Sequence, residues 1–223
     1  MSEAGAAPSG RGARRALTPK GLAMRERLLD AAGQAFADYG YERARVSDIV
    51  AIAGTSHGNF YRHFPDKPAI LMAVLERLYV TLSRATNRAP GTADVPTEPE
   101  LVRRNAAFFH LYADHRDLLR VAREAAAAGE HGGFLDSWLR IRRIFIDRNA
   151  RWIARLQAEG KVSVAVKPEL MAEALGALTE QLAYVEVGLA RVRPRPERLD
   201  ELGRVCGIVW HRTLFGAAAG PGR

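Results

Sequence analysis

A short stretch near residue 60 concentrates side chains that can donate hydrogen bonds to phosphates and to base edges. Residues 55–67, TSHGNFYRHFPDK, carry two histidines, an asparagine, an arginine, a tyrosine and a lysine. Asparagine and arginine form paired hydrogen bonds with adenine and guanine edges, and the backbone N–H groups at a helix N-terminus bind phosphate. These side chains are suited to binding a polyanion such as nucleic acid rather than to catalysis.

The spacing places these groups on one side of a short helix. Ser56 is a typical N-cap residue and Pro65 must end a helix, so we expect a helix over 57–63. Phe60 and Phe64, four residues apart, form its buried side. The other side of the helix is then exposed, and its residues are His57, Gly58, Asn59, Tyr61, Arg62 and His63.

A second short helix precedes this one. Ser47 followed by Asp48 predicts its start, and Gly54 follows it after about two turns. Helices this short are marginal alone in water, so both need a partner to cover their apolar sides. A longer helix over 19–39, ended by Gly40, can provide that cover. Two short helices joined by a tight turn predict a helix-turn-helix. The pattern alone leaves open a solvated polar surface without a partner.

The rest of the chain has the periodicity of an all-α protein with two domains. Residues 1–18 are predicted to be a disordered basic arm, and 217–223 a disordered tail. Alternation in 160–168 resembles a strand, but it has no partner and we expect a loop. Thr97 and Glu100 have the spacing of a capping box. The further expected helices are 66–85, 98–113, 115–128, 133–159, 168–191 and 196–215.

Composition limits the class of protein. The chain has 223 residues, 48% of them hydrophobic, a net charge of +8 and a pI of about 10.1. Such a charge favours a polyanionic partner. The single Cys206 cannot form an internal disulfide, and no secretory signal is visible, so the cytoplasm is the expected location. The longest apolar stretch, 170–190, carries three glutamates and is too polar to span a membrane.

No catalytic or metal-binding pattern is present in the sequence. The six histidines are scattered, and none belongs to a Cys/His cluster or to a pair with metal-ligand spacing. A glycine-rich phosphate loop and a nucleophile elbow are both missing. We therefore expect a protein without enzymatic activity, metal or cofactor.

An aromatic stripe runs along the helix expected over 133–159. One interpretation is a core; the other is a largely apolar ligand pocket with a few polar groups, and sequence leaves both open. Asn149 and Thr179 are polar residues on apolar helix sides, and Gly176 leaves room beside them. The candidate ligand-binding residues are Phe109, Tyr112, Trp138, Phe145, Asn149, Trp152, Gly176 and Thr179.

The last two helices are each apolar along one side. Two copies of such a helix pair can form a four-helix interface with two-fold symmetry, which predicts a homodimer. The candidate interface residues are Leu182, Val185, Val205 and Val209, within stripes that also include Leu175, Leu178, Leu202 and Thr213.

The segment VSDIVAIAGTSHGNFYRHFPDKPAIL resembles the DNA-binding segment of the tetracycline-repressor (TetR) family of regulators. The similarity rests on Ile49-x-x-x-Ala53-Gly54, on the Phe60-Tyr61 pair, and on order and spacing over residues 25–75. This sequence departs from the usual pattern at three positions. Thr55 stands where the family usually has Val, Val50 stands where Ala is usual, and Arg45 replaces a frequent Thr.

The resemblance implies a role for each matching residue. Tyr61 and Lys67 occupy positions that hold phosphates, and Asn59 stands where a Thr or Ser often touches backbone or base. Arg45 and Ser47 open the second helix, where backbone contacts are common. The implied DNA-binding set is Arg45, Ser47, Ser56, His57, Gly58, Asn59, Tyr61, Arg62, His63 and Lys67.

The resemblance also implies a domain plan: 19–68 binds DNA, helix 66–85 connects, and 86–216 binds an effector and dimerises. The expected function is a ligand-responsive regulator, most simply a repressor, bound to a near-palindromic double-stranded DNA and released by a small, largely apolar effector. Two rivals remain open. One is a helical ligand-binding or adaptor protein without specific DNA binding, and the other is a non-specific nucleoid-type DNA-binding protein.

Overall fold

The computed structural model describes residues 18–85, 95–128, 134–162 and 166–216. Within these ranges the chain is helical and contains no strand, so the predicted all-α fold class is confirmed. The predicted arm, apart from residue 18, and the predicted tail lie outside the described residues. The helices are α1 (Pro19–Tyr39), α2 (Val46–Ile52), α3 (His57–His63), α4 (Lys67–Ala85), α5 (Glu98–Asp114), α6 (Arg116–Ala128), α7 (Phe134–Ala158), α8 (Pro168–Ala183), the π-helix η1 (Tyr184–Gly188) and α9 (Pro196–Phe215).

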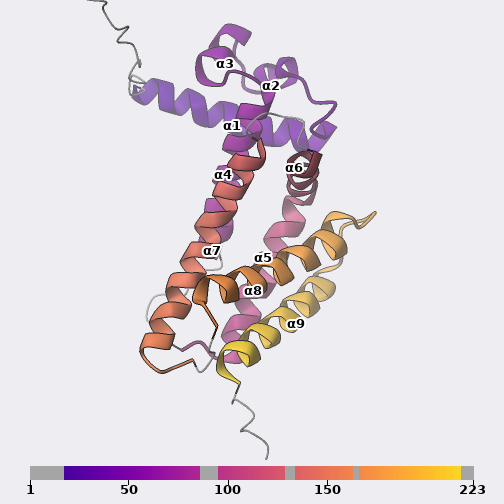
Figure 1. The fold of residues 1–223 in the computed structure, drawn as a ribbon. Helices are drawn as coiled ribbons and strands as arrows, with labels where there is room; N and C mark the ends of the chain where they lie inside the picture. Colours follow the sequence, from indigo (N-terminus) through magenta and orange to yellow (C-terminus); the bar gives the residue numbers. More distant parts are fainter. Residues whose placement is uncertain (1–17, 86–94, 129–133, 163–165, 217–223) are drawn as a thin grey trace, which may run out of the picture.

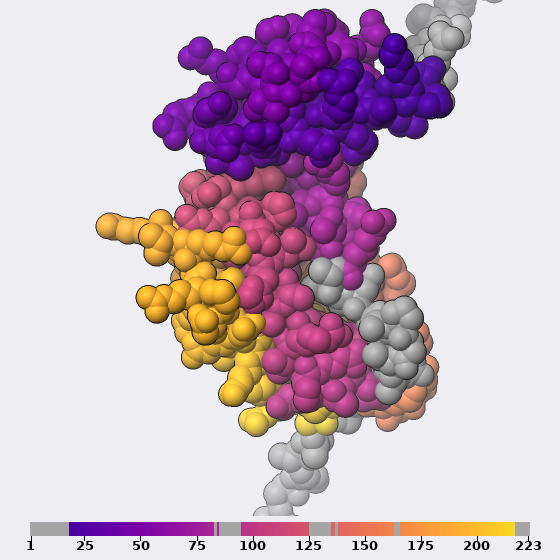
Figure 2. Space-filling view, turned by 180° about the vertical axis from the view of Figure 1, so that it is seen from behind, coloured from indigo at the N-terminus to yellow at the C-terminus, as the bar shows by residue number. Residues whose placement is uncertain are grey.

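The helices form a small N-terminal unit on top of a longer helical body. Figure 1 shows α1 lying across the upper end of the molecule, with α2 and α3 above it and the remaining helices below. In the space-filling view of Figure 2, the N-terminal unit covers one end of the body. Among the described helices, none is long and apolar enough to cross a membrane.

The short helices α2 and α3 are held by burial of their apolar sides. Ile49 of α2, Phe60 of α3 and Leu28 of α1 are all fully buried in one core. The turn between α2 and α3 passes through Gly54 at φ 59°, a left-handed conformation that favours glycine. Ser56 caps α3 as predicted, because its Oγ accepts a hydrogen bond from Asn59 N at 3.3 Å. The helix-turn-helix is therefore present where the sequence placed it.

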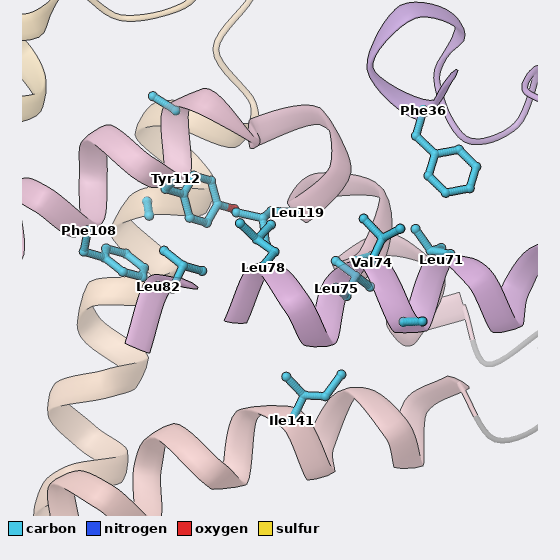
Figure 3. Close-up of a cluster of buried hydrophobic side chains, with 14 of the residues drawn as sticks. Phe36, Leu71, Val74, Leu75, Leu78, Leu82, Phe108, Tyr112, Leu119 and Ile141 are labelled. Atoms are coloured by element: carbon cyan, nitrogen blue, oxygen red, sulfur yellow. The ribbon is translucent and has the colours of Figure 1, made fainter. Parts of the chain in front are cut away.

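Helix α4 belongs to both parts of the molecule. Its buried side chains lie between α1 at one end and α5, α6 and α7 further along (Figure 3). Leu71 and Leu75 are fully buried, and Leu82, near the other end of the helix, is close to Phe108 of α5. A movement of α4 would therefore disturb the cores of both the N-terminal unit and the body.

Helices α5 and α9 are packed with almost no space between their backbones. A Cβ atom at Gly203 would lie 2.3 Å from Cα of Ala106, and one at Gly207 would lie 2.4 Å from Cα of Val102. Only glycine permits so close an approach of two helices. Cys206, between these glycines, is fully buried, as expected for a small core residue.

One predicted helix start and one predicted capping box need correction. Helix α2 begins at Val46 rather than Ser47, because the Asp48 carboxylate accepts a hydrogen bond from Arg45 N at 2.8 Å and so moves the cap back to Arg45. At α5 only half of the predicted capping box forms. Thr97 Oγ1 accepts from Glu100 N at 3.4 Å, whereas the Glu100 side chain pairs with Arg104 instead.

The helix predicted over 168–191 ends earlier than expected. Regular α8 stops at Ala183, and the wider π-turn of η1 follows, closed by Leu189 N donating to Tyr184 O at 2.9 Å. Arg116 of α6 then donates to Ala190 O at 3.0 Å and fixes the chain beyond the helix. In the 160–168 segment the described residues form a turn at Gly160 and an irregular stretch up to α8, while 163–165 lie outside the described part.

Candidate functional site

The outer side of α3 is open to solvent. Phe60 is fully buried, and the ring of Tyr61 packs edge-on against it at 5.3 Å while Tyr61 itself remains 55% exposed. His57, Gly58 and Arg62 are exposed as predicted. A Cβ atom at Gly58 would meet nothing within 4 Å, so a partner could approach the α3 backbone closely there.

Two members of the predicted set are less accessible than expected. Asn59 is half-buried, and its Nδ2 donates to Thr55 Oγ1 at 2.8 Å. His63 is also half-buried, and its Nδ1 is enclosed without a hydrogen-bond partner. Burial, together with the charges of Arg62 and Arg25, lowers the pKa of His63, so its imidazole is neutral at pH 7. Asn59 would have to give up its bond to Thr55 before it could turn to a base edge.

The start of α2 lies on the exposed surface too. Arg45 and Ser47 are both exposed, and the Arg45 N–H is used by Asp48. Ser56, at the start of α3, is exposed, and its hydroxyl hydrogen remains available although its oxygen caps the helix. These positions can add contacts on either side of Tyr61.

Lys67 is held by the protein itself. Its Nζ donates to Tyr41 O at 2.8 Å and to Ala44 O at 3.1 Å, and lies 4.4 Å from the centre of the Tyr41 ring. Burial raises the pKa of that tyrosine to about 12. The ammonium therefore stabilises the turn between α1 and α2, and a phosphate at Lys67 would compete with these carbonyls.

We expect Lys67→Met to lower the free energy of unfolding by about 1–3 kcal/mol, because it removes charge-assisted hydrogen bonds to half-buried carbonyls. Lys20→Met, a matched change at an exposed residue of α1, should leave stability unchanged. Chemical denaturation followed by circular dichroism measures both. Equal stabilities for the two variants would contradict the structural role of Lys67.

One residue that organises the helix-turn-helix was missed by the sequence analysis. The Arg27 guanidinium of α1 donates to the carbonyl of Ala53 and lies 3.5 Å from that of Gly54. It thereby fixes the turn that sets α3 against α2. No periodic signal distinguishes Arg27 from other surface arginines of α1, since its partner carbonyls lie 26 and 27 residues away.

The body contains a cavity of about 190 Å³, here called the first cavity. Five predicted ligand-binding residues line it: Phe145, Asn149, Trp152, Gly176 and Thr179. The further lining residues are Leu101, Arg104, Asn105, Phe108, Arg148, Arg155, Glu180 and Trp210. The aromatic stripe of α7 therefore faces space at these positions, rather than a completely filled core.

A second cavity of about 350 Å³ adjoins the first, sharing Phe108, Phe145 and Glu180 as walls. Tyr112 and Trp138, predicted as ligand-binding residues, line this one. Its other walls come from Tyr79, Leu82, Leu119, Arg123, Leu139, Arg142, Ala177 and Gln181. Seven of the eight predicted residues thus line one or other of two neighbouring cavities, and Phe145 lines both.

Phe109 is fully buried and lines neither cavity. One residue along α5, Phe108 faces both of them instead. Adjacent residues of a helix point to different sides of it. Because both residues are phenylalanine, the sequence does not indicate which of the two side chains faces the cavities. Phe109 therefore fits a core role better than a ligand contact.

The two predicted polar contacts differ in what they still offer. The Thr179 hydroxyl donates to Leu175 O and accepts from Trp210 Nε1, both at 3.1 Å. Asn149 is only 9% exposed, and its Nδ2 has no partner. The amide of Asn149 is the group that remains open to a ligand.

Charged groups also reach these cavities. Arg142 pairs with Glu180 at 2.7 Å and with Glu173. Burial raises the pKa of Glu180, and the charge of Arg142 opposes that shift. Arg148 lies 4.7 Å above the Phe145 ring, and burial followed by the like charge of Arg104 lowers its pKa to about 10.

The predicted dimer residues lie on α8, η1 and α9, which run along one side of the body (Figure 1). Val185, Val205 and Val209 are 45%, 51% and 37% exposed, and Leu182 is half-buried. The same stripes include Leu175 and Leu202, which are buried within the chain. We call the exposed apolar residues Leu178, Val185, Val205 and Val209 the α8–α9 surface.

In the described part of the chain no cluster of three or more His, Cys, Asp or Glu could hold a metal ion.

Comparison with known proteins gives matches for the N-terminal unit and for the whole fold. Residues 28–74 match the family described as "Bacterial regulatory proteins, tetR family". The A-factor receptor protein of Streptomyces griseus is 27% identical over 146 residues, which are 66% of this chain and 49% of that protein. The uncharacterized HTH-type transcriptional regulator YvdT of Bacillus subtilis is 39% identical over 70 residues, 31% of this chain and 36% of that protein. The chain thus spans a third to a half of the length of these curated relatives.

Solved structures match over most of the chain. A putative TetR-family transcriptional regulator from Mesorhizobium loti superposes with a TM-score of 0.70 at 17% identity, covering 87% of this chain and 98% of that one. The SmeT–triclosan complex superposes with a TM-score of 0.66 at 22% identity, covering 90% and 96%. At these identities the structures establish the fold, and the sequence match establishes the helix-turn-helix. Residues 28–74 are thus similar to the DNA-binding segment of the tetR family of bacterial regulatory proteins, and the chain shares its fold with solved structures of that description.

Proposed function

We propose that the protein is a transcription regulator that binds double-stranded DNA as a homodimer and responds to a small molecule. The observation that carries the proposal is the outer side of α3. Tyr61, His57 and Arg62 are exposed there beside a glycine with open space above it, on a helix fixed from behind by Phe60. A rigid helix with donors on its open side suits the major groove.

The short length of α3, the helix proposed to contact bases, is one reason to propose a dimer. One α3 helix of seven residues reaches only a few base pairs, whereas two helices related by a two-fold axis read both halves of a near-palindrome. The α8–α9 surface is the apolar region we assign to that interface. The expected place of action is the cytoplasm, where the chromosome lies.

The cavities of the body supply a site for the effector. We expect the ligand to bind more tightly to a dimer in which the spacing of the two α3 helices does not match the DNA half-sites. Ligand binding then lowers DNA affinity, at most by the ratio of the ligand's affinities for the mismatched and the DNA-binding states. We propose that the protein is a repressor that its ligand releases from DNA. One match to the same fold is a complex with the small molecule triclosan, which supports a small-molecule site in this fold.

The proposal is tested by titrating the full-length protein with the DNA that flanks its own coding region. We expect binding to an inverted repeat, weakening steeply as salt concentration rises because phosphate contacts release counterions. Salt-dependent binding without any sequence preference would instead support a nucleoid-type protein. No binding to duplex DNA at low salt would leave a ligand-binding or adaptor protein.

Tyr61→Phe is expected to weaken binding to all duplexes alike by roughly tenfold, because a hydrogen bond to a charged phosphate is lost without loss of base information. Tyr39→Phe removes a hydroxyl from another exposed tyrosine in the N-terminal unit and serves as the control. Fluorescence anisotropy at fixed salt compares the two. An unchanged affinity for Tyr61→Phe would contradict the phosphate contact.

A further inference from the structure

The first cavity holds buried hydrogen-bond donors that the protein does not satisfy. Among the described residues, three buried side-chain atoms have no partner: His63 Nδ1, Arg104 Nε and Asn149 Nδ2. Two of the three line this one cavity, and both of those are nitrogen donors. Buried donors without acceptors are rare in folded proteins because they are costly. A ligand that brings acceptor oxygens would satisfy both.

The side chains that line the first cavity carry more positive than negative charge. Three arginines line it, Arg104, Arg148 and Arg155, against a single carboxylate, Glu180. That carboxylate already pairs with Arg142 at 2.7 Å. Arg104 pairs with Glu100, yet its charge still acts on Arg148, whose pKa burial and this like charge lower to about 10. An added negative charge would relieve this repulsion between guanidinium groups.

The remaining wall is apolar and aromatic. Phe108, Phe145, Trp152 and Trp210 contribute rings, and the indole N–H of Trp210 is already bonded to Thr179. At about 190 Å³ the cavity is smaller than most drug-sized sites, so its occupant is small. Apolar walls around a cationic, donor-rich region suit a molecule with a hydrocarbon part and one acidic end.

We propose that the first cavity binds a small apolar carboxylate. Its oxygens accept hydrogen bonds from Arg104, Arg148 and Asn149, and its aryl or short alkyl part lies among the aromatic rings. This inference rests on the proposed function, because it names the chemical class of the small molecule to which the regulator responds.

The test uses matched pairs of probes of nearly the same shape, in which the carboxylate of one is replaced by a neutral amide in the other. The full-length protein is titrated by calorimetry with 3-phenylpropanoate and 3-phenylpropanamide, and with hexanoate and hexanamide. Tryptophan fluorescence gives a second readout, since Trp152 and Trp210 line the cavity. We expect at least one carboxylate to bind saturably, and roughly tenfold or more tightly than its amide, because charge-assisted hydrogen bonds are the stronger ones.

Variants locate the binding. Arg148→Gln should weaken carboxylate binding roughly tenfold and leave amide binding unchanged. Arg151→Gln removes the same charge from an exposed position of α7 outside the cavity and should have no effect. Asn149→Asp keeps the side-chain shape but adds a negative charge, so it should weaken carboxylate binding further than Asn149→Leu does. Thermal unfolding of each variant verifies that the fold is retained.

Three results would overturn the inference. They are no saturable binding of either carboxylate at millimolar concentration, equal binding of acid and amide, and equal binding of inorganic phosphate, which lacks the apolar part. The DNA titration described above is performed without probes, so a failure of the proposed function is recognised separately. Carboxylate binding that leaves DNA affinity unchanged would uphold the cavity assignment and contradict the coupling to DNA.

Discussion

Gly203→Ala and Gly207→Ala are each expected to lower the free energy of unfolding by about 3 kcal/mol, the upper end of what overpacking usually costs. The added Cβ atom would fall within about 2.4 Å of Cα of Ala106 or Val102, and both obstacles are backbone. A side chain could rotate away, but a backbone can give way only if α5 and α9 separate along their whole contact. Chemical denaturation followed by circular dichroism measures the loss.

Gly33→Ala in α1 is the matched control. No atom lies within 4 Å of the Cβ it would introduce, so the change should be neutral or stabilise by about 0.5–1 kcal/mol through helix propensity. If Gly203→Ala and Gly207→Ala were as stable as Gly33→Ala, the close approach of α5 and α9 would be wrong.

Val205→Arg and Val209→Arg are expected to convert the proposed dimer to a monomer while helicity stays unchanged. Each side chain is exposed in the single chain, so arginine is tolerated there. In the proposed dimer the same positions are covered, and a buried unpaired charge is costly enough to break the interface. Sedimentation velocity measures assembly, and circular dichroism measures folding.

Val80→Arg makes the same change at an exposed residue of α4, away from the α8–α9 surface, and should remain dimeric. With the dimer lost, affinity for an inverted repeat should fall to that of a half-site. A wild-type protein that sediments as a monomer at micromolar concentration would refute this interface, as would dimeric Val205→Arg and Val209→Arg variants.

Local chemistry explains which parts of the fold were predictable. Thr18, Ser56 and Thr97 each cap a helix through a bond that spans only three residues, and Gly40 ends α1 at φ 75°. Such signals lie within a few positions of the structure they determine. The helix-turn-helix and most helix ends could therefore be predicted from sequence.

Long-range contacts explain what was not predictable at the proposed DNA-binding surface and at the end of α8. Lys67 bonds carbonyls more than twenty residues away, and Arg27 does the same across the turn. The early end of α8 likewise depends on packing, since a Cβ atom at Gly188 would lie 3.3 Å from the Tyr112 hydroxyl. Sequence spacing carries no information about partners at such distances.

The cavities were predicted only in part. Aromatic spacing identified the α7 stripe but not the division into two spaces, which depends on how neighbouring helices fill the gaps. The cavity arginines had a signal that was overlooked. Arg148 follows Phe145 by three residues and precedes Trp152 by four, which places a cation on the aromatic side of the helix. Arg104 stands in the same relation to Leu101 and Phe108.

Helix α4 packs in both parts of the molecule, and the two cavities differ in whether they contact it directly. This difference matters for how the protein can evolve. Tyr79 and Leu82 of α4 line the second cavity, whereas none of the described side chains of α4 lines the first. The two cavities share Phe108, Phe145 and Glu180 as a common wall, so an occupant of the first cavity can act on the second through these residues. Substitutions among the other walls of the first cavity can therefore change which molecule is recognised and leave the contacts of α4 intact. Under the proposed function, ligand preference can therefore change in descendants of this chain while the contacts of α4 that would couple ligand binding to DNA binding are kept.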